Sequence, residues 1–165
     1  MQSVCSPICA SRLVKASKKA EIQTTRARRE AIKTIPQLIR EAQIAFNAFI
    51  RERDRIQPCI CCGRTEGMGY GLSSHGWDCG HYRSTGSASH LRFNEDNAHR
   101  QLVLCNRHGA GRAVDYRIGL IERIGLARVE ALESNNQVHK WTADELRAIK
   151  AEYRAKLKEL EKATA

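Results

Sequence analysis

The chain has 165 residues, 42% of them hydrophobic but only 5% aromatic, which predicts one compact domain with a small core and long solvated extensions. The 28 Lys and Arg residues outnumber the 18 Asp and Glu residues and give a net charge of +10, which suits a polyanionic partner better than solubility alone. No stretch is apolar enough to span a membrane and no secretion leader opens the chain, so we exclude a membrane-spanning protein and expect a cytoplasmic one.

The first predicted segment, residues 1–35, is a basic arm. Residues 11–35 carry eight basic and two acidic residues and have no clear apolar stripe. Such a segment is a solvated basic helix or a disordered arm, and a phosphate-contacting role is about as well supported as mere solvation.

Residues 36–57 are predicted to form a helix that leads into the core. Pro36 suits the first turn of a helix. Apolar residues recur after it at steps of three and four, which predicts one buried face. These residues are Leu38, Ala42, Ala45, Phe46 and Phe49.

The third segment, residues 58–126, contains most of the cysteines, histidines and glycines. The helical period vanishes from Pro58 to about Gly111, which predicts short strands and loops around a metal ion. The stretch "GMGYGLSSHG", residues 67–76, is typical of a loop or hairpin tip, and we favour an insertion without function. A helix should resume near Arg112, with Val114, Ile118 and Ile121 on one face.

Residues 127–165 form a predicted C-terminal helical region. A short helix is expected at 127–133, and Thr142 with Glu145 makes a capping box at the start of the last helix. That helix has an apolar seam that packs on the core or on a second copy of the chain. Its residues are Leu146, Ile149, Tyr153, Leu157 and Leu160.

Two cysteine-containing turns predict a structural zinc site. The seven cysteines are an odd number and lie in close pairs, and without a secretion signal metal ligation explains them better than disulfides. Cys59 and Cys62 form a Cys-x2-Cys turn, and Cys105 and His108 form a Cys-x2-His turn, which together supply the four ligands of a tetrahedral Zn²⁺. His99 is the other candidate for the fourth ligand, and Cys61 competes with Cys62.

The stretch "WDCGHY", residues 77–82, lies between these turns and suggests phosphodiester hydrolysis. His81 is suited to be the general base, because a histidine titrates near neutral pH. Asparagine and aspartate oxygens suit Mg²⁺ or Mn²⁺, and Asn97 and Asn106 follow downstream. Asp78 either binds that cation or orients His81.

The order of these motifs resembles the HNH class of ββα-metal endonucleases and, more closely, the NinG (Rap) family of lambdoid phages. The matching stretches include "AFNAFIRERDR", "PCICCG", "WDCGHYR", "LRFNEDNAHRQ" and "CNRH". The resemblance covers roughly residue 42 to the C-terminus. It implies an α+β fold, in which a small zinc-stabilised ββα-metal (HNH-like) centre is flanked by long, mainly basic α-helices.

The resemblance also implies a function and roles for the site residues. The implied function is a structure-specific DNA endonuclease that cleaves Holliday junctions and D-loops with Mg²⁺ or Mn²⁺. His81 falls at the general base, Asn97 at the better metal ligand, Asn106 at a second metal position, and Asp78 is supporting. Symmetric cutting of a junction needs two sites, so we expect a homodimer, and phage or host recombination proteins are further candidate partners.

The chain departs from the family pattern at two places. The family usually has a second cysteine where this chain has Leu102, so His108 or His99 must complete the zinc site. At the N-terminus "VCSPICAS" resembles half of a four-cysteine finger, but Cys5 and Cys9 alone cannot hold a tetrahedral ion. We therefore expect no second zinc site.

Basic side chains in and around the centre are candidates for backbone contacts to DNA, which position the duplex without reading its sequence. These are Arg83, Arg92, Arg100, Arg107 and Arg112. Two alternatives stay open. One is a non-catalytic, zinc-dependent DNA-binding protein, and the other is a less selective HNH nuclease.

Overall fold

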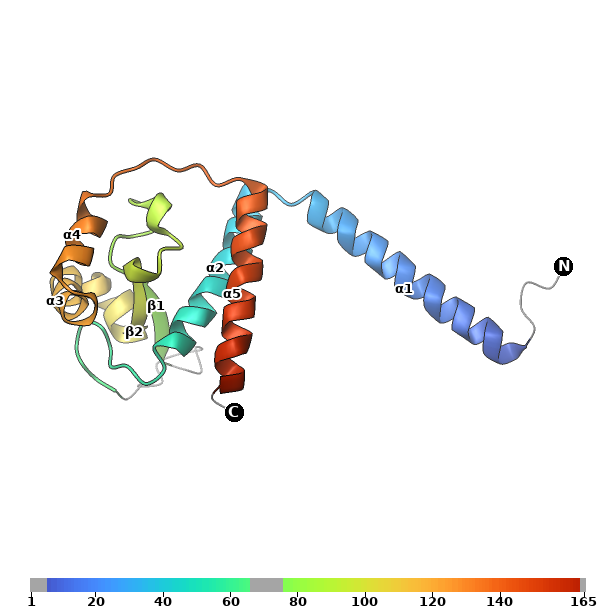
Figure 1. Cartoon of the computed structure of the whole chain (residues 1–165), viewed down its shortest axis with the longest axis horizontal. Coiled ribbons are helices and arrows are strands. Elements are labelled where there is room, and N and C mark those ends of the chain that lie inside the picture. Colours follow the sequence, from blue (N-terminus) through green and yellow to red (C-terminus); the bar gives the residue numbers. More distant parts are fainter. Residues whose placement is uncertain (1–5, 66–75, 164–165) are drawn as a thin grey trace. The chain divides into compact units, whose positions relative to one another are not determined.

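The computed structural model describes residues 6–65 and 76–163, so Cys5 and nearly all of the predicted loop at 67–76 lie outside the described residues. The chain divides into two compact units, residues 1–37 and residues 38–165. The helices and strands are α1 (Pro7–Ala31), α2 (Ile35–Arg53), β1 (Trp77–His81), β2 (Ala98–Leu102), α3 (Ala113–Ile124), α4 (Leu126–Ser134) and α5 (Ala143–Ala163) (Figure 1).

The first unit is built on α1, so the basic arm is helical rather than disordered. Ser6 caps its N-terminus by accepting a hydrogen bond from the Cys9 amide at 3.2 Å, and Pro7 occupies the first turn, where its missing N–H costs nothing. At the other end the amide of Ile32 donates to the carbonyl of Arg28. The helix has no buried residue.

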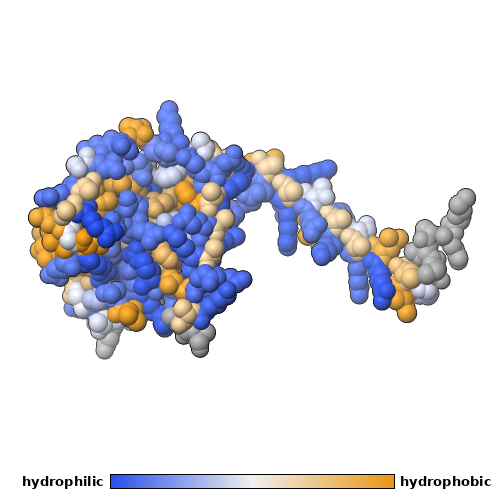
Figure 2. All heavy atoms as spheres, in the orientation of Figure 1, coloured by the Kyte–Doolittle hydropathy of each residue, from blue (hydrophilic) through white to orange (hydrophobic). Residues whose placement is uncertain are grey.

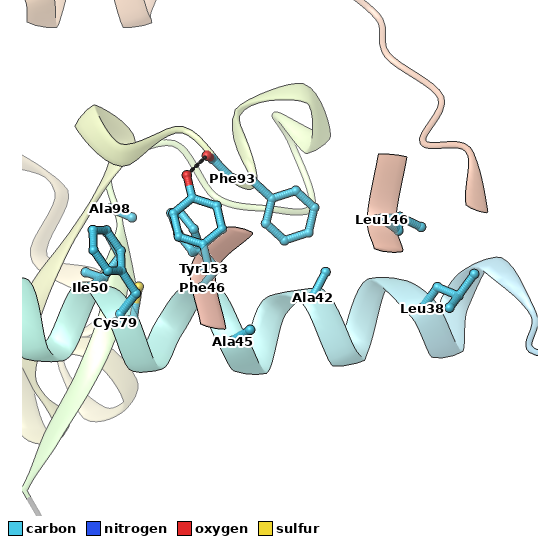
Figure 3. Close-up of a cluster of buried hydrophobic side chains, with 11 residues drawn as sticks. Leu38, Ala42, Ala45, Phe46, Ile50, Cys79, Phe93, Ala98, Leu146 and Tyr153 are labelled. Carbon is cyan, nitrogen blue, oxygen red and sulfur yellow. Dashed lines mark hydrogen bonds between the residues drawn. The ribbon is translucent and has the colours of Figure 1, made fainter. Parts of the chain in front are cut away.

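In the second unit α2 and α5 lie side by side and form the larger part of the core (Figures 1 and 3). The predicted face of α2 is confirmed, because all five predicted residues are buried, with Ile50 beside them. Phe46 packs edge-on against Tyr153 of α5, with ring centroids 4.8 Å apart, and the Tyr153 hydroxyl reaches the Phe93 carbonyl at 3.3 Å.

The C-terminal seam therefore packs on the core of its own chain. Leu146 and Tyr153 are buried in the cluster that α2 lines, and Ile149, Leu157 and Leu160 pack against it. The predicted capping box is also confirmed, because the Glu145 carboxylate accepts from the Thr142 amide at 2.8 Å and the Glu145 amide donates back to the Thr142 hydroxyl at 3.3 Å.

The strands β1 and β2 form an antiparallel pair whose register runs from Trp77 opposite Leu102 to His81 opposite Ala98. One face of this hairpin meets α2, since Cys79 and Ala98 belong to the α2–α5 cluster. The other face meets α3, where the buried Tyr116 hydroxyl donates to the Gly80 carbonyl at 2.9 Å.

Of the three apolar residues expected on one face of α3, only Ile121 packs against the core. Val114 and Ile118 are 75% and 55% exposed, and the buried residues are Tyr116 and Leu120. Apolar side chains accordingly show at the edge of the second unit where α3 lies (Figure 2). The mixed α+β class is confirmed, while the HNH-like ββα assignment stays a prediction. None of the helices in the described residues is long and apolar enough to cross a membrane.

Candidate metal centre

Four cysteine sulfurs converge between the first cysteine turn and the end of the hairpin. Cys59, Cys61 and Cys62 lie in a tight turn, in which the Gly63 amide donates to the Cys59 carbonyl at 3.0 Å and Gly63 takes the left-handed φ of +68°. Cys105 lies in a π-helical turn, Leu104–His108, that follows β2. The four Sγ atoms all lie within 4.8 Å of one another.

The spacing and surroundings of these sulfurs fit a zinc ion. Tetrahedral Zn²⁺ with Zn–S bonds of about 2.3 Å places its sulfurs about 3.8 Å apart. The pairs Cys59–Cys61 and Cys62–Cys105 are each 3.6 Å apart. A small closed site of this type holds its fold together, because metal binding is coupled to folding.

Hydrogen bonds to the sulfurs favour the thiolate form that a metal requires. The backbone amide of Leu102 donates to Cys59 Sγ at 3.3 Å, and the Gln101 side chain donates to Cys61 Sγ at 3.3 Å. The pKa of Cys59 is lowered to about 4, chiefly because it accepts a hydrogen bond from Cys61 and also because backbone N–H groups point at it. The pKa values of Cys61 and Cys62 are raised, the first chiefly by that same hydrogen bond and the second chiefly by burial. The donor set therefore suits a soft or borderline cation.

The structure brings together three of the four predicted zinc ligands. Cys59, Cys62 and Cys105 are in the group, but the fourth member is Cys61 and not His108. His108 lies beside the group and lines, with Cys62 and Cys105, a pocket of about 240 Å³. The run of three cysteines in four residues was the signal for Cys61.

Asp78 adjoins the cysteine group and is held by two side chains of the same π-helical turn. Its carboxylate accepts from Asn106 Nδ2 at 3.0 Å and from Arg107 at 2.8 Å to each oxygen. Partial burial raises the pKa of Asp78, but the hydrogen bonds from Arg107 and Asn106 and the charges of Arg107 and Arg51 outweigh it, so the net shift is downward. Asp78 is therefore an ionised carboxylate. It is hydrogen-bonded to Asn106, which directly follows Cys105 in the chain.

His81 lies on the other face of the hairpin. It is three positions from Asp78 in a strand, where side chains alternate, and its ring lies 6.0 Å from Phe46 on the α2 side. His81 Nε2 is 3.0 Å from the carbonyl of Arg92, to which it must donate. Burial is the main cause that lowers its pKa, so the ring is neutral at pH 7. Within the described residues no hydrogen bond links His81 to Asp78 or Asn106.

Asn97 is fully buried and all its polar atoms are engaged with backbone. Its Oδ1 accepts from the Arg83 amide at 2.8 Å, and its Nδ2 donates to the carbonyls of Arg83 at 3.0 Å and Leu91 at 3.1 Å. These bonds fix both ends of the connection between β1 and β2, and His81 fixes the same connection through Arg92. The arrangement suits a positioning role for Asn97 better than the predicted metal-ligand role.

The predicted DNA-contacting arginines divide into two groups. Arg83, Arg92 and Arg100 are used by the fold: Arg83 donates to the carbonyls at the end of α4, Arg92 to Gln43 and Thr85, and Arg100 stacks on Trp77 at 3.7 Å. Arg107 and Arg112 have exposed side chains, paired with Asp78 and Asp115. The side chains of the first group are partly buried, whereas those of the second are exposed.

Comparison with known proteins links the chain to phage proteins. The family model "Bacteriophage Lambda NinG protein" matches residues 1–163. Protein ninG of Salmonella phage P22 and protein ninG of Escherichia phage lambda are each 53% identical to the chain over 133 residues, which cover 81% of this chain and 62% of theirs. Protein ninG of Escherichia phage 933W is 52% identical over the same length and is covered to 63%. The match thus spans less than two thirds of these relatives. No solved structure matches the chain.

Proposed function

The chain belongs to the NinG family, and from this membership and the site we propose that it is a metal-dependent endodeoxyribonuclease. Its proposed substrates are branched recombination intermediates, namely Holliday junctions and D-loops. The observation that carries the proposal is the 3.0 Å hydrogen bond from Asn106 Nδ2 to the Asp78 carboxylate, which holds the two side chains together at the turn that contains Cys105. Two oxygen-bearing side chains at such a turn suit the binding of a hard divalent cation. The net charge of +10 suits the binding of the negatively charged DNA backbone.

Asp78 and Asn106 are the proposed holders of Mg²⁺ or Mn²⁺. A carboxylate and an amide oxygen are ligands that such hard cations prefer, and the lowered pKa of Asp78 keeps it ionised at neutral pH. A cation there would stabilise the charge that builds up on the phosphate during hydrolysis. Arg107, which is 58% exposed and already bonded to Asp78, can turn to a phosphate oxygen.

The role of the cysteine group is structural. Cys105 and Asn106 are neighbours in one turn, so ligation of Cys105 fixes the position of the Asn106 amide. Burial holds His81 neutral, as the predicted general base requires, but its ring lies on the face of the hairpin opposite Asp78, so His81 is assigned no step at the proposed cation site.

Branched DNA and a second copy of the chain are the proposed partners, with recombination proteins as further candidates. The sequence left open that the apolar seam of the last helix packs on a second copy of the chain. In the structure this seam packs on α2. The proposed two-fold dimer must therefore use another surface.

The experiment is a cleavage assay on a four-way junction with Mg²⁺, with fork, duplex and single-stranded DNA as parallel substrates. Asp78→Asn should reduce cleavage roughly 100-fold or more, because it removes the charge that holds the cation. Asp96→Asn is the matched control, since Asp96 also accepts both hydrogen bonds of an arginine, Arg128, away from Asp78. Cleavage of the junction by Asp78→Asn at the wild-type rate would contradict the proposal.

A non-catalytic, zinc-dependent DNA-binding protein is the second candidate. It is favoured by the engagement of His81 and Asn97 with backbone carbonyls, which leaves both side chains a purely structural use. In that case the wild-type chain binds the junction but cuts none of the four substrates with either Mg²⁺ or Mn²⁺.

A further inference from the structure

The basic residues of α1 are concentrated on one side of the helix. The helix carries seven basic and two acidic residues. At 100° per residue, six of the seven basic residues fall within an arc of about 120°. This basic side consists of Arg12, Lys15, Lys18, Lys19, Arg26 and Arg29. Arg28 points about 160° away from Arg26, and Glu21 also lies outside the arc.

The basic side is exposed. Its acidic neighbours in α1 are Glu21, three residues after Lys18, and Glu30, which falls at the edge of the arc four residues after Arg26. All six residues are exposed, and within the described part of the chain none of them has an ion pair. Of the acidic residues, Glu30 is paired with Lys33. Figure 2 shows hydrophilic side chains that project along α1.

This arrangement is unfavourable for an isolated helix. Arg12 with Lys15, Lys15 with Lys19, and Arg26 with Arg29 are like charges three or four residues apart, and each such pair costs a few tenths of a kcal/mol. The helix has no buried residue whose packing could offset this. A polyanion that neutralises the row would relieve the repulsion.

The dimensions of the basic side fit duplex DNA. From Arg12 to Arg29 the helix rises about 26 Å. A duplex carries one phosphate charge per about 1.7 Å of its axis, so roughly 15 phosphates lie alongside that length. The major groove is also wide enough to admit a helix.

A membrane surface is a poorer fit, because an interfacial helix needs large apolar residues opposite its basic side. The opposite side of α1 has one large apolar residue, Leu13, together with Glu21, Arg28 and small residues. The small residues are Cys9, Ala10, Ser17, Ala20, Thr24, Ala27 and Ala31.

We propose that α1 is a DNA-binding helix whose basic side lies along the phosphate backbone of a duplex arm, independently of base sequence. The inference goes beyond the proposed nuclease site, since it concerns other residues and binding rather than cleavage. It shares with that proposal only the assumption that DNA is the substrate. Backbone contacts of this kind position DNA without specifying it, which suits a protein that meets many sequences.

The test compares Arg26→Gln with Arg28→Gln in the full chain. The two variants have the same chemistry and net charge, and they differ only in which side of α1 they alter. Duplex binding is followed by fluorescence anisotropy without Mg²⁺ over a range of salt concentrations. Arg26→Gln should weaken binding several-fold at about 0.1 M salt and reduce the log–log salt slope by about 0.9. Arg28→Gln should leave both unchanged.

A variant with Lys15, Lys19, Arg26 and Arg29 all changed to Gln extends the measurement. Its salt slope should fall by about 3 to 4. Glutamine is a good helix former, and circular dichroism should show that helicity is kept.

Three results would overturn the inference. The first is an equal loss of affinity in Arg26→Gln and Arg28→Gln, which would mean that only overall charge matters. The second is an unchanged salt slope in the fourfold variant. The third is tighter binding of duplex RNA, or of vesicles rich in anionic lipid, than of duplex DNA at the same salt. Absence of cleavage by wild type would contradict the proposed nuclease but would not alter these binding results.

Discussion

His99 is a histidine buried without a partner for one ring nitrogen. It is 2% exposed, and its Nδ1 has no hydrogen bond in the described part of the chain. The pKa of His99 is lowered to about 3, chiefly by burial. The negative charge of Asp54 raises this pKa, whereas repulsion from Arg53 and Arg123 lowers it further. The folded protein therefore keeps this ring neutral where an exposed histidine would be protonated.

This burial predicts a loss of stability in mild acid. In the unfolded chain the pKa of a histidine is about 6.5. Between about pH 6.5 and pH 3 the unfolded state binds a proton that the folded state does not, so the free energy of unfolding falls as pH falls, by up to about 1.4 kcal/mol per pH unit. His99→Phe should remove this component, as measured by denaturant unfolding at pH 6.5, 5.5 and 4.5. An identical pH dependence in wild type and variant would show that His99 does not contribute.

His81 offers a test that separates chemistry from support of the fold. His81→Gln keeps an N–H donor for the Arg92 carbonyl but cannot accept a proton as a base. It should fold like wild type. The general-base prediction expects cleavage roughly 100-fold slower, whereas the position of His81 on the face opposite Asp78 expects cleavage within a few-fold of wild type. His81→Ala should lose stability, because it also removes the N–H donor. If His81→Gln cleaves within a few-fold of wild type, the side chain only fixes the connection between the strands.

At the scale of elements, the helices with one clear apolar period were predictable and α3 was not. In α2 and α5 a single stripe matches the buried face, and the capping box marks where α5 begins. In α3 two stripes compete. The sequence favoured Val114 and Ile118, whereas the hairpin selects the stripe of Tyr116 because its hydroxyl meets the Gly80 carbonyl. That choice depends on a long-range contact which no local pattern contains.

The cysteine turn makes a prediction about metal content. Cys61→Ser should lower zinc affinity at least about 10-fold and lower the melting temperature, because it removes one of the four converging sulfurs. His108→Ala should leave both unchanged, since His108 is outside the group. Zinc affinity is measured by competition with a chromophoric chelator. Loss of zinc in His108→Ala but not in Cys61→Ser would contradict this prediction. It would show that His108, and not Cys61, is the fourth zinc ligand.

At the scale of the whole molecule, the sequence predicted most participants of the site but not their grouping. The residue types and spacing indicated Cys59, Cys62 and Cys105, and the carboxylate and amide of Asp78 and Asn106. They did not indicate that β1 turns Asp78 and His81 to opposite faces. Alternation along a strand settles this only after the strand and its pairing are known.

The interior of the hairpin was likewise unpredictable. A Cβ on Gly80 would lie 2.0 Å from the side-chain oxygen of Gln101. The glycine therefore makes room for an amide that donates to Cys61 and to the carbonyl of Gly111. A diagonal contact of this kind between the two strands leaves no periodic pattern in the sequence.

The four sulfurs are divided unequally between the segments they would join. Three come from one stretch of four residues, and Cys105, which follows after 42 intervening residues, supplies the fourth. An ion bound to this group would be anchored firmly on one side and by a single bond on the other. Exchange of that one bond would release the turn Leu104–His108 while the ion stayed on the first turn, so metal retention and the anchoring of this second turn are separable properties of the centre.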